Sequence, residues 1–305
     1  MPVSPTDQQL ARLLSPAFGR ESFRVDRRKP LTFVCGGNNS NGVSSLRLQF
    51  LSHIRKDACP ILPVLAEKAF PHQLVERNLQ SFEEFLASAA NCVLIFVESP
   101  GSYAETGLFA ALPSIIEKTF VVNTRGDHSR ETSFLTLGPI KLIRKKSWFD
   151  EVLYLERDAV TFAEAQQIVE IILRTLPRYE NALVFHPERK FSDLDLRLQL
   201  ACVQMTVALL RAATAQRVTS ILREHFADVD AERIERFLSL LKSIDAIERS
   251  DEVYFNARVD AFVNDPLICS TNFSVDEVRA QTLSWHADND AQVAVFLREQ
   301  LRIDI

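Results

Sequence analysis

The stretch Cys92-Val-Leu-Ile-Phe-Val97, followed by Glu98-Ser-Pro-Gly-Ser-Tyr-Ala-Glu-Thr-Gly107, decides the fold. Six apolar residues bounded by polar ones are typical of a strand that is buried on both faces of a sheet. A loop rich in serine and glycine leaves this strand and enters a helix over residues 106–117, which Pro113 interrupts. A buried strand, a polar loop and a helix in this order indicate a parallel α/β sheet.

The same alternation continues on both sides of this stretch. Further strands are predicted at residues 31–35, 60–65, 120–122 and 152–155. Two prolines place the strand at residues 60–65 at a sheet edge. Amphipathic helices are predicted at residues 44–54, 80–90 and about 162–176. The pattern predicts an α/β domain over residues 1–180, with an open parallel sheet and helices on both faces.

Residues 181–305 have a different, mainly helical pattern. Helices are predicted at residues 194–210, 214–226 and 230–244, and a hairpin at residues 246–255. This is the order of a winged helix-turn-helix, so we predict a mainly α domain for DNA binding or docking. A closing amphipathic helix near residues 283–297 suits packing or self-association, which makes a homo-oligomer possible.

Composition excludes several classes of protein. With 305 residues, 47% hydrophobic residues and a net charge of -5, the chain is typical of a soluble globular protein. The negative charge argues against coating nucleic acid or an anionic membrane, and no apolar stretch approaches the roughly 20 residues of a membrane span. The cysteines are scattered and the histidines lack metal-ligand spacing, so we expect no metal and reduced thiols in the cytoplasm.

Two loops carry the candidate site, because ligands of parallel sheets bind at the carboxyl ends of strands. Cys35-Gly36-Gly37-Asn38-Asn39 follows the first strand, and free amides at the next helix start suit a phosphate or a ribose hydroxyl. A plain glycine turn is an equally weighted alternative. In the second loop, Glu98 and Glu105 lie near one strand end, as the carboxylates of retaining glycosidic chemistry do.

Glu105 has two interpretations from spacing alone. In the first turn of its helix, the helix dipole would lower the pKa of its carboxyl and favour the ionised form of a nucleophile. The alternative is a first-turn glutamate that only stabilises its helix, and spacing alone favours this alternative. Tyr103 could stack on a base or anchor the loop by packing.

Basic residues form two further candidate contacts for nucleic acid or a partner. One group follows a predicted Gly-Pro turn, and a solvated surface explains it equally well. The other lies in the second domain, where seven Lys/Arg against six Asp/Glu over residues 197–245 leave protein docking at least as plausible. The candidates are Lys141, Arg144, Lys145 and Lys146 in the first group, and Arg217, Arg233 and Arg236 in the second.

Phe33-Val-Cys-Gly-Gly37 together with Glu98-Ser-Pro-Gly-Ser102 and Glu105 resembles the nucleoside 2-deoxyribosyltransferase superfamily, whose fold is Rossmann-like. With Phe134-Leu-Thr-Leu-Gly-Pro-Ile-Lys-Leu-Ile-Arg144, the order of motifs looks more closely like the retron effectors that join such a domain to a winged helix. The resemblance covers residues 30–155 by motif and the remainder by architecture.

The resemblance implies an antiphage enzyme with Glu105 as the catalytic nucleophile. It implies cleavage of the N-glycosidic bond of an NAD-like nucleotide, without a cofactor, and restraint by a reverse transcriptase with its RNA-linked single-stranded DNA. The loops would bind ribose, phosphate and base. The substrate-binding candidates are Gly36, Gly37, Asn38, Glu98, Ser99, Gly101, Ser102 and Tyr103.

Two other functions fit the same residues. One is a non-catalytic nucleotide sensor that controls a DNA-binding winged helix, and the other is a scaffold for a ribonucleoprotein. Hydrolysis and transfer to an acceptor also stay open.

Overall fold

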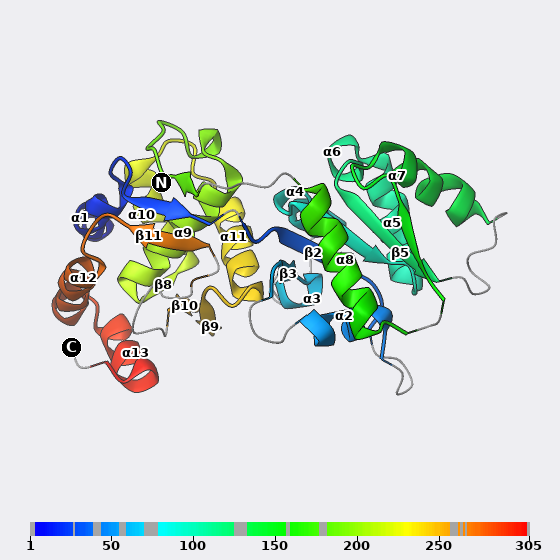
Figure 1. Cartoon of the computed structure of the whole chain (residues 1–305). Coiled ribbons are helices and arrows are strands. Elements are labelled where there is room, and N and C mark those ends of the chain that lie inside the picture. The colour runs from blue at the N-terminus through cyan, green and yellow to red at the C-terminus, as the bar shows by residue number, and fades with distance from the viewer. Residues whose placement is uncertain are drawn as a thin grey trace. The chain divides into compact units, whose positions relative to one another are not determined.

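A computed structural model describes residues 4–26, 28–38, 44–54, 59–69, 79–124, 133–156, 159–176, 182–256, 262, 265 and 267–303. The chain divides into two compact units (Figure 1). We call Arg28–Tyr179 the α/β unit, and Met1–Arg27 with Glu180–Ile305 the helical unit.

The α/β unit is built on a five-stranded parallel sheet in the order β3-β2-β4-β5-β6. Its strands are β2 (Leu31–Cys35), β3 (Leu62–Val64), β4 (Cys92–Phe96), β5 (Thr119–Thr124) and β6 (Val152–Leu155). The open parallel sheet is confirmed, and β3 lies at an edge as its proline predicts.

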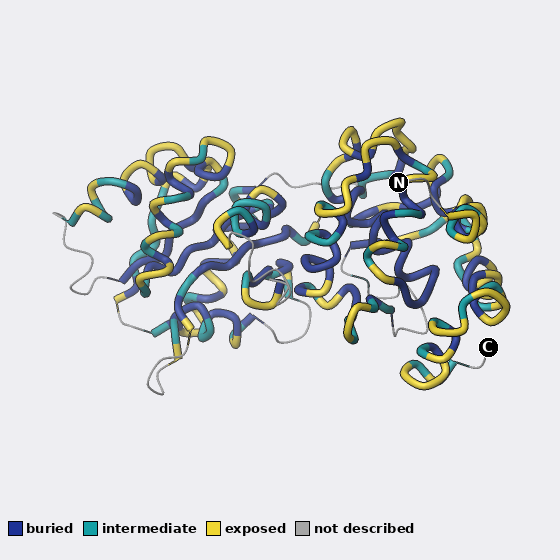
Figure 2. The backbone as a smooth tube through the Cα atoms, turned by 180° about the vertical axis from the view of Figure 1, so that it is seen from behind, coloured by how far each residue is buried: buried dark blue, intermediate teal, exposed yellow. Residues whose placement is uncertain are grey.

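Helices cover both faces of this sheet, and its inner strands β2, β4 and β5 are buried (Figure 2). The helices are α2 (Leu46–Ile54), α3 (Ala66–Ala69), α4 (Leu79–Ala89), α5 (Pro100–Ala111), α6 (Pro113–Ile116), α7 (Lys141–Lys146) and α8 (Phe162–Thr175). The apolar sides of α2 and α8 share one core with Val34, Leu94 and Phe120. On the opposite face, Phe33 of β2 contacts Phe109 of α5, with 6.2 Å between ring centroids.

The strand order changes direction between β2 and β4. From β2 the chain moves outward to β3, and it then crosses to β4 on the other side and continues outward through β5 and β6. The loops after β2 and β4 therefore border the switch point, where open α/β sheets bind ligands.

Two local predictions in this unit were wrong. The predicted helix at residues 106–117 begins at Pro100 instead, because Ser99 caps it and proline suits its first position. Gly138 and Pro139 form no turn, since they lie within the π-helical stretch η4 (Thr136–Ile140), which continues into α7.

The helix α9 (Leu196–Leu210) is buried at the centre of the helical unit, and several other elements of this unit pack around it. Its other helices are α1 (Pro5–Leu14), η1 (Ser15–Phe18), η5 (Phe191–Asp193), α10 (Ala215–His225), α11 (Ala231–Ser243), α12 (Val275–Asn289) and α13 (Ala291–Leu301). Its strands are β1 (Phe23–Val25), β7 (Leu183–Val184), β8 (Ala212–Thr214), β9 (Glu248–Ser250), β10 (Val253–Phe255) and β11 (Ile268–Thr271). They form two antiparallel sheets, in the orders β11-β1-β7 and β8-β10-β9.

The first 27 residues do not join the α/β unit, although the predicted domain of residues 1–180 included them. The helix α1 buries Leu10 and Leu14 and packs against α10 and α12. The strand β1 pairs with β7 on one side and β11 on the other. At the other end of the chain, the predicted helix near residues 283–297 is divided at Asp290, which caps α13.

Candidate active site

Glu98 follows β4 and uses its carboxylate to hold the neighbouring loop. Its Oε1 accepts hydrogen bonds from the backbone N–H groups of Gly37 at 2.9 Å and Arg47 at 3.1 Å. Its Oε2 accepts one from the N–H of Leu46 at 2.6 Å. The carboxylate therefore caps the start of α2 from a distant position in the chain, in addition to the local cap by Ser45.

The carboxylate of Glu98 occupies the position predicted from the sequence for a substrate phosphate or ribose hydroxyl. The predicted free amides are not free, because they donate to Glu98. Gly36 is required by packing, since a Cβ atom there would lie 2.8 Å from both Arg47 Cβ and Glu98 Oε1. In the described part of these loops, Gly36, Gly37 and Glu98 form a scaffold.

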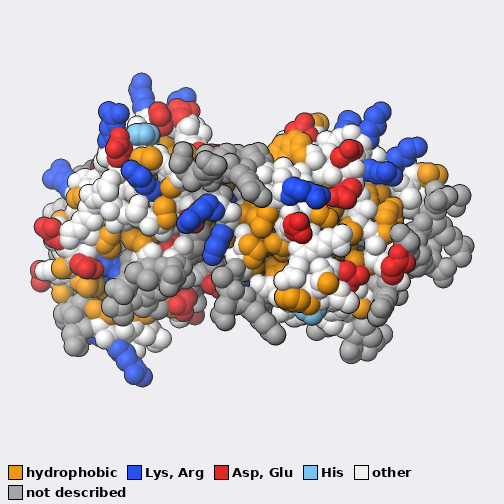
Figure 3. Space-filling view, in the orientation of Figure 1, with side chains coloured by type: hydrophobic (Ala, Val, Ile, Leu, Met, Phe, Trp, Pro, Cys, Tyr) orange, Lys and Arg blue, Asp and Glu red, His pale blue; other side chains and the backbone are white. Residues whose placement is uncertain are grey.

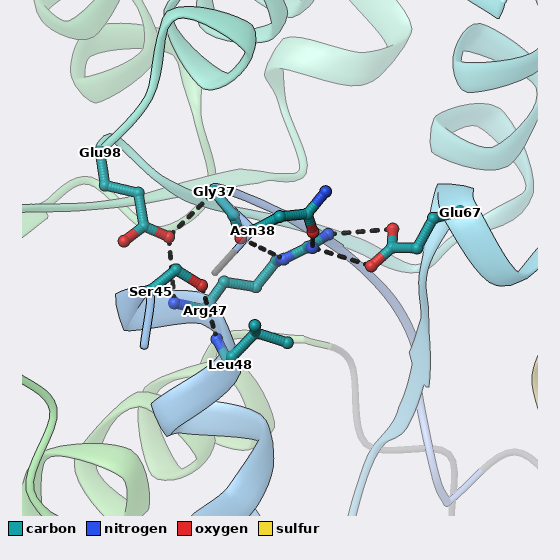
Figure 4. A network of polar contacts seen from close by, with 7 residues as sticks. All are labelled: Gly37, Asn38, Ser45, Arg47, Leu48, Glu67 and Glu98. Atoms are coloured by element: carbon teal, nitrogen blue, oxygen red, sulfur yellow. Dashed lines mark hydrogen bonds and ion pairs between the residues drawn. The ribbon is translucent and has the colours of Figure 1, made fainter. Parts of the chain in front are cut away.

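Arg47 completes this scaffold (Figure 4). Its side chain is 4% exposed, its Nε donates to the carbonyl oxygen of Gly37 at 3.1 Å, and its Nη2 donates to Asn38 Oδ1. The guanidinium also pairs with Glu67 of α3 at 2.8 Å. Asn38, a predicted substrate contact, thus helps to orient Arg47.

The serines of the second loop begin α5. Ser99 accepts a hydrogen bond from the N–H of Ser102 at 3.2 Å, and the N–H groups of Glu98 and Ser99 donate to Ser102 Oγ at 3.1 and 3.0 Å. This reciprocal capping box accounts for Ser99 and the buried Ser102 without a ligand. Gly101 is exposed and Tyr103 is half-buried on the same first turn.

Glu105 lies in the second turn of α5 and presents a different situation. Its Oε2 atom is buried and has no hydrogen-bond partner. The carboxyl group also forms a hydrogen bond with the side chain of Cys35, at the end of β2. The thiol of Cys35 stays protonated because burial, and then the charge of Glu105, raise its pKa well above the ordinary value. Glu105 therefore combines one hydrogen bond to Cys35 with a buried oxygen atom whose hydrogen-bonding capacity is unused.

Burial raises the pKa of Glu105 to about 7, and the nearby charge of Glu83 adds to the increase. The charge of Arg47 lowers the pKa of Glu105, and the charge of Glu67 raises it by a smaller amount. The hydrogen bond with Cys35 also lowers this pKa. The predicted lowering of this pKa by the helix dipole was wrong, because Glu105 is the sixth residue of α5 and lies beyond its first turn. At neutral pH the carboxyl is close to half ionised.

Sequence reasoning missed three charged members of this site, namely Arg47, Glu67 and Glu83. They come from α2, α3 and α4, and no short motif connects them. The helix start was detectable, because Ser99-Pro100 is a cap followed by a first-turn proline.

The first basic group lies on α7, where Lys141, Arg144 and Lys145 are exposed. Figure 3 shows Lys and Arg side chains over this part of the surface. None of the contacts described for the Glu105 site involves these residues.

The basic residues of the helical unit have partners within it. Arg217 pairs with Asp7 at 3.3 Å and with Asp290. Arg236 pairs with Glu232 at 2.6 Å, one turn earlier on α11, and the guanidinium of Arg233 lies 5.4 Å from the ring centroid of Phe237. Arg217 thus connects α1 and the start of α13 to α10.

The described ranges contain neither a metal-binding cluster nor a membrane-spanning helix. No group of three or more His, Cys, Asp or Glu residues there could hold a metal ion. No helix in those ranges has the length and apolar character that crossing a membrane requires.

The chain is similar to two retron proteins of known sequence. At 30% identity over 145 residues, the chain is similar to the "Retron Ec86 putative ribosyltransferase/DNA-binding protein" of Escherichia coli, with 46% of each chain covered. At 31% identity over 125 residues, it is similar to the "Retron Ec73 putative ribosyltransferase/DNA-binding protein" of the same organism, with 39% of each covered. The matched stretches span less than half the length of these curated relatives.

A broader match covers more of the molecule. The family described as "STM3845 retron effector protein" matches residues 43–249, which is more than half of the chain. This range includes the β4–α5 loop with Glu98 and Glu105, and it extends through α9, α10 and α11. The chain belongs to the STM3845 retron effector family.

Proposed function

We propose that this retron effector cleaves the N-glycosidic bond of a nucleotide, with Glu105 as the nucleophile. The observation that carries the proposal is the buried, unpartnered Oε2 atom of Glu105 beside the switch point of a parallel sheet. A buried polar atom without a partner is rare in folded proteins and calls for a functional explanation. The relatives named as ribosyltransferases fit chemistry at the anomeric carbon of ribose.

The charges around Glu105 favour a substrate that carries positive charge at the glycosidic nitrogen. Glu105, Glu83 and Glu67 interact electrostatically, and Arg47 is the cation among the groups that influence Glu105. A nicotinamide ring, as in NAD, would be attracted to these carboxylates and would favour the ionised form of Glu105. The same carboxylates would stabilise the oxocarbenium-like transition state.

The proposed reaction has two steps. Ionised Glu105 attacks C1′ of the ribose, a carbon–oxygen bond forms, and the base leaves with the electron pair of the broken carbon–nitrogen bond. Water or another acceptor then attacks C1′, releases the carboxylate and loses a proton. Glu98 contributes by fixing the loops, since its oxygens are engaged by backbone N–H groups.

We further propose that the helical unit docks the partner. Its order α9-β8-α10-α11-β9-β10, with the sheet β8-β10-β9, supports a winged helix. The relatives' names include DNA binding. A reverse transcriptase with its RNA-linked single-stranded DNA would restrain the enzyme in the cytoplasm and release it during phage infection.

The partner proposal is tested by measuring binding of the whole chain to that complex over a range of salt concentrations. Affinity that falls steeply with salt supports nucleic-acid contacts, and a flat response supports protein docking. Absence of binding at low salt contradicts the partner assignment.

The catalytic proposal is tested by chromatography of nucleotides after incubation with purified protein, alone and with the reverse transcriptase complex. Wild type should release the base from NAD or from a deoxynucleoside, and Glu105→Gln should lose this turnover by about a thousandfold or more. Glu117→Gln, an exposed glutamate of the same unit, is the matched control. Full activity of folded Glu105→Gln refutes the proposal.

A further inference from the structure

Asn123 lies near the carboxyl end of β5 and is 1% exposed. Its Oδ1 accepts a hydrogen bond from the backbone N–H of Thr124 at 2.9 Å. Because a backbone N–H can only donate, the atom that meets it must be the amide oxygen, and the other end is the NH₂ group. This Nδ2 group is buried and has no hydrogen-bond partner.

The side chain of Asn123 lies on the same face of the sheet as Cys35. Cys35 pairs with Ile95, and Ile95 pairs with Val121, so these three share a face. Side chains alternate along a strand, so Asn123, two residues after Val121, returns to that face. It is the face covered by α5, as the contact between Phe33 and Phe109 shows.

Glu105 bonds to Cys35 on this face. The strands β2 and β5 are separated by β4, so they lie about 10 Å apart at the spacing of hydrogen-bonded strands. Asn123, at the carboxyl end of β5, is therefore across the switch point from Cys35 and the proposed nucleophile, at the same edge of the sheet. The strands β2 and β5 are labelled in Figure 1.

Among the described residues of the α/β unit, two buried side-chain nitrogen or oxygen atoms lack a partner, namely Glu105 Oε2 and Asn123 Nδ2. One is a carboxylate oxygen and the other is a hydrogen-bond donor. Leaving a buried polar atom unsatisfied costs stability, so two such atoms at the same edge and on the same face of the sheet point to a shared ligand.

We propose that Asn123 is a substrate-binding residue that donates a hydrogen bond from Nδ2 to an acceptor atom of the nucleotide. The inference rests on the proposed function and adds a second contact to it. A nucleoside spans a distance comparable to the two-strand separation, and it presents carbonyl, hydroxyl and phosphate oxygens as acceptors. The residue acts in binding, while Glu105 performs the bond exchange.

The test is calorimetric titration of the full-length protein with NAD and with 2′-deoxyadenosine, in a Glu105→Gln background that prevents turnover. Adding Asn123→Asp keeps the acceptor for Thr124 and replaces the donor, and Asn123→Ala is the second variant if the first does not fold. Thr119→Val is the matched control, because it removes a buried polar group from the opposite end of β5.

We expect the Asn123 variants to bind the nucleotide roughly threefold to tenfold more weakly, the value of one hydrogen bond. The Thr119→Val control should bind like its background. Unchanged affinity in folded Asn123 variants overturns the inference while the Glu105 turnover result stands. If neither nucleotide binds to Glu105→Gln, nucleotide binding by Asn123 is overturned. The proposed function fails separately, when wild type and Glu105→Gln release base equally.

Discussion

Glu98 and Glu105 lie seven positions apart on one loop and helix, yet their surroundings are opposite in kind. Glu98 accepts three hydrogen bonds from backbone N–H groups and joins β4 to the start of α2. Glu105 keeps a buried oxygen without a partner and has two other glutamates among the charges that influence it. One carboxylate stabilises the fold, and the other raises its free energy.

The difference shows how to tell the residues of a polar loop that support the fold from those that are candidates for catalysis. A glutamate near a strand end, two glycines and two serines all suggested substrate contacts, but most of them satisfy one another. Buried polar groups that have no hydrogen-bond partner within the protein are the candidates for substrate binding or catalysis.

The largest effect on stability should come from Glu98→Gln. The amide would place an NH₂ group against backbone donors, so we expect the free energy of unfolding to fall by about 2–4 kcal/mol. Urea denaturation of the purified variant measures this. Glu117→Gln should be neutral, and a Glu98→Gln protein as stable as wild type would show that this carboxylate is not a scaffold.

Glu105→Gln should change stability in the opposite direction. Since the pKa of Glu105 is raised from 4.5 to about 7, the native state binds more protons than the unfolded state between these values. The free energy of unfolding therefore falls as pH rises through this window, and the loss is complete above pH 7. At pH 8 we expect Glu105→Gln to be about 1–2 kcal/mol more stable than wild type.

Urea denaturation at pH 5 and pH 8 would measure this difference. The two proteins should be closer in stability at pH 5, where Glu105 is protonated. A variant that is less stable than wild type at pH 8 would contradict the strained state of the carboxylate.

Ser99→Ala should have a moderate effect of about 1 kcal/mol, the usual value of a helix cap. It loosens the start of α5, so turnover should fall along with stability. Thr161→Ala is the matched control, since it removes the equivalent capping box from α8. Equal losses of turnover in both variants would mean that the cap of α5 has no special importance to the site.

Glu83→Gln should have the smallest effect, because we expect it to shift the pH profile of kcat/KM by less than about one pH unit. Removing the charge of Glu83 lowers the pKa of Glu105, so the rise of kcat/KM with pH should move to lower pH. Glu84→Gln changes the adjacent residue and should leave the profile in place. A shift to higher pH would exclude repulsion between Glu83 and Glu105.

Much of the fold follows from local sequence. The strand Cys92–Phe96 was predictable because parallel strands buried on both faces are continuous apolar runs. The edge strand at residues 152–155 is only partly buried, and its short apolar run was still sufficient to predict it. The placement of β1 was not predictable, since its partners β7 and β11 lie far along the chain. Long-range pairing has no local signal.

The site was predictable only in part. The position of Glu105 follows from a motif, but its protonation depends on Glu83 and Glu67, which reach it through the topology of the sheet. The predicted strand at residues 120–122 stopped short of Asn123, and the unused donor of this buried side chain is visible only once its neighbours are placed.

The assignment of both chain ends to the helical unit has a consequence for synthesis. The α/β unit is complete when residue 179 has been made, whereas the helical unit needs residues up to its last helix, α13. At about 5–20 residues per second, the 122 residues from residue 179 to the end of α13 (301 minus 179) take roughly 6–24 s. On the ribosome, the unit that contains Glu105 thus finishes first, before the helical unit can close around α9.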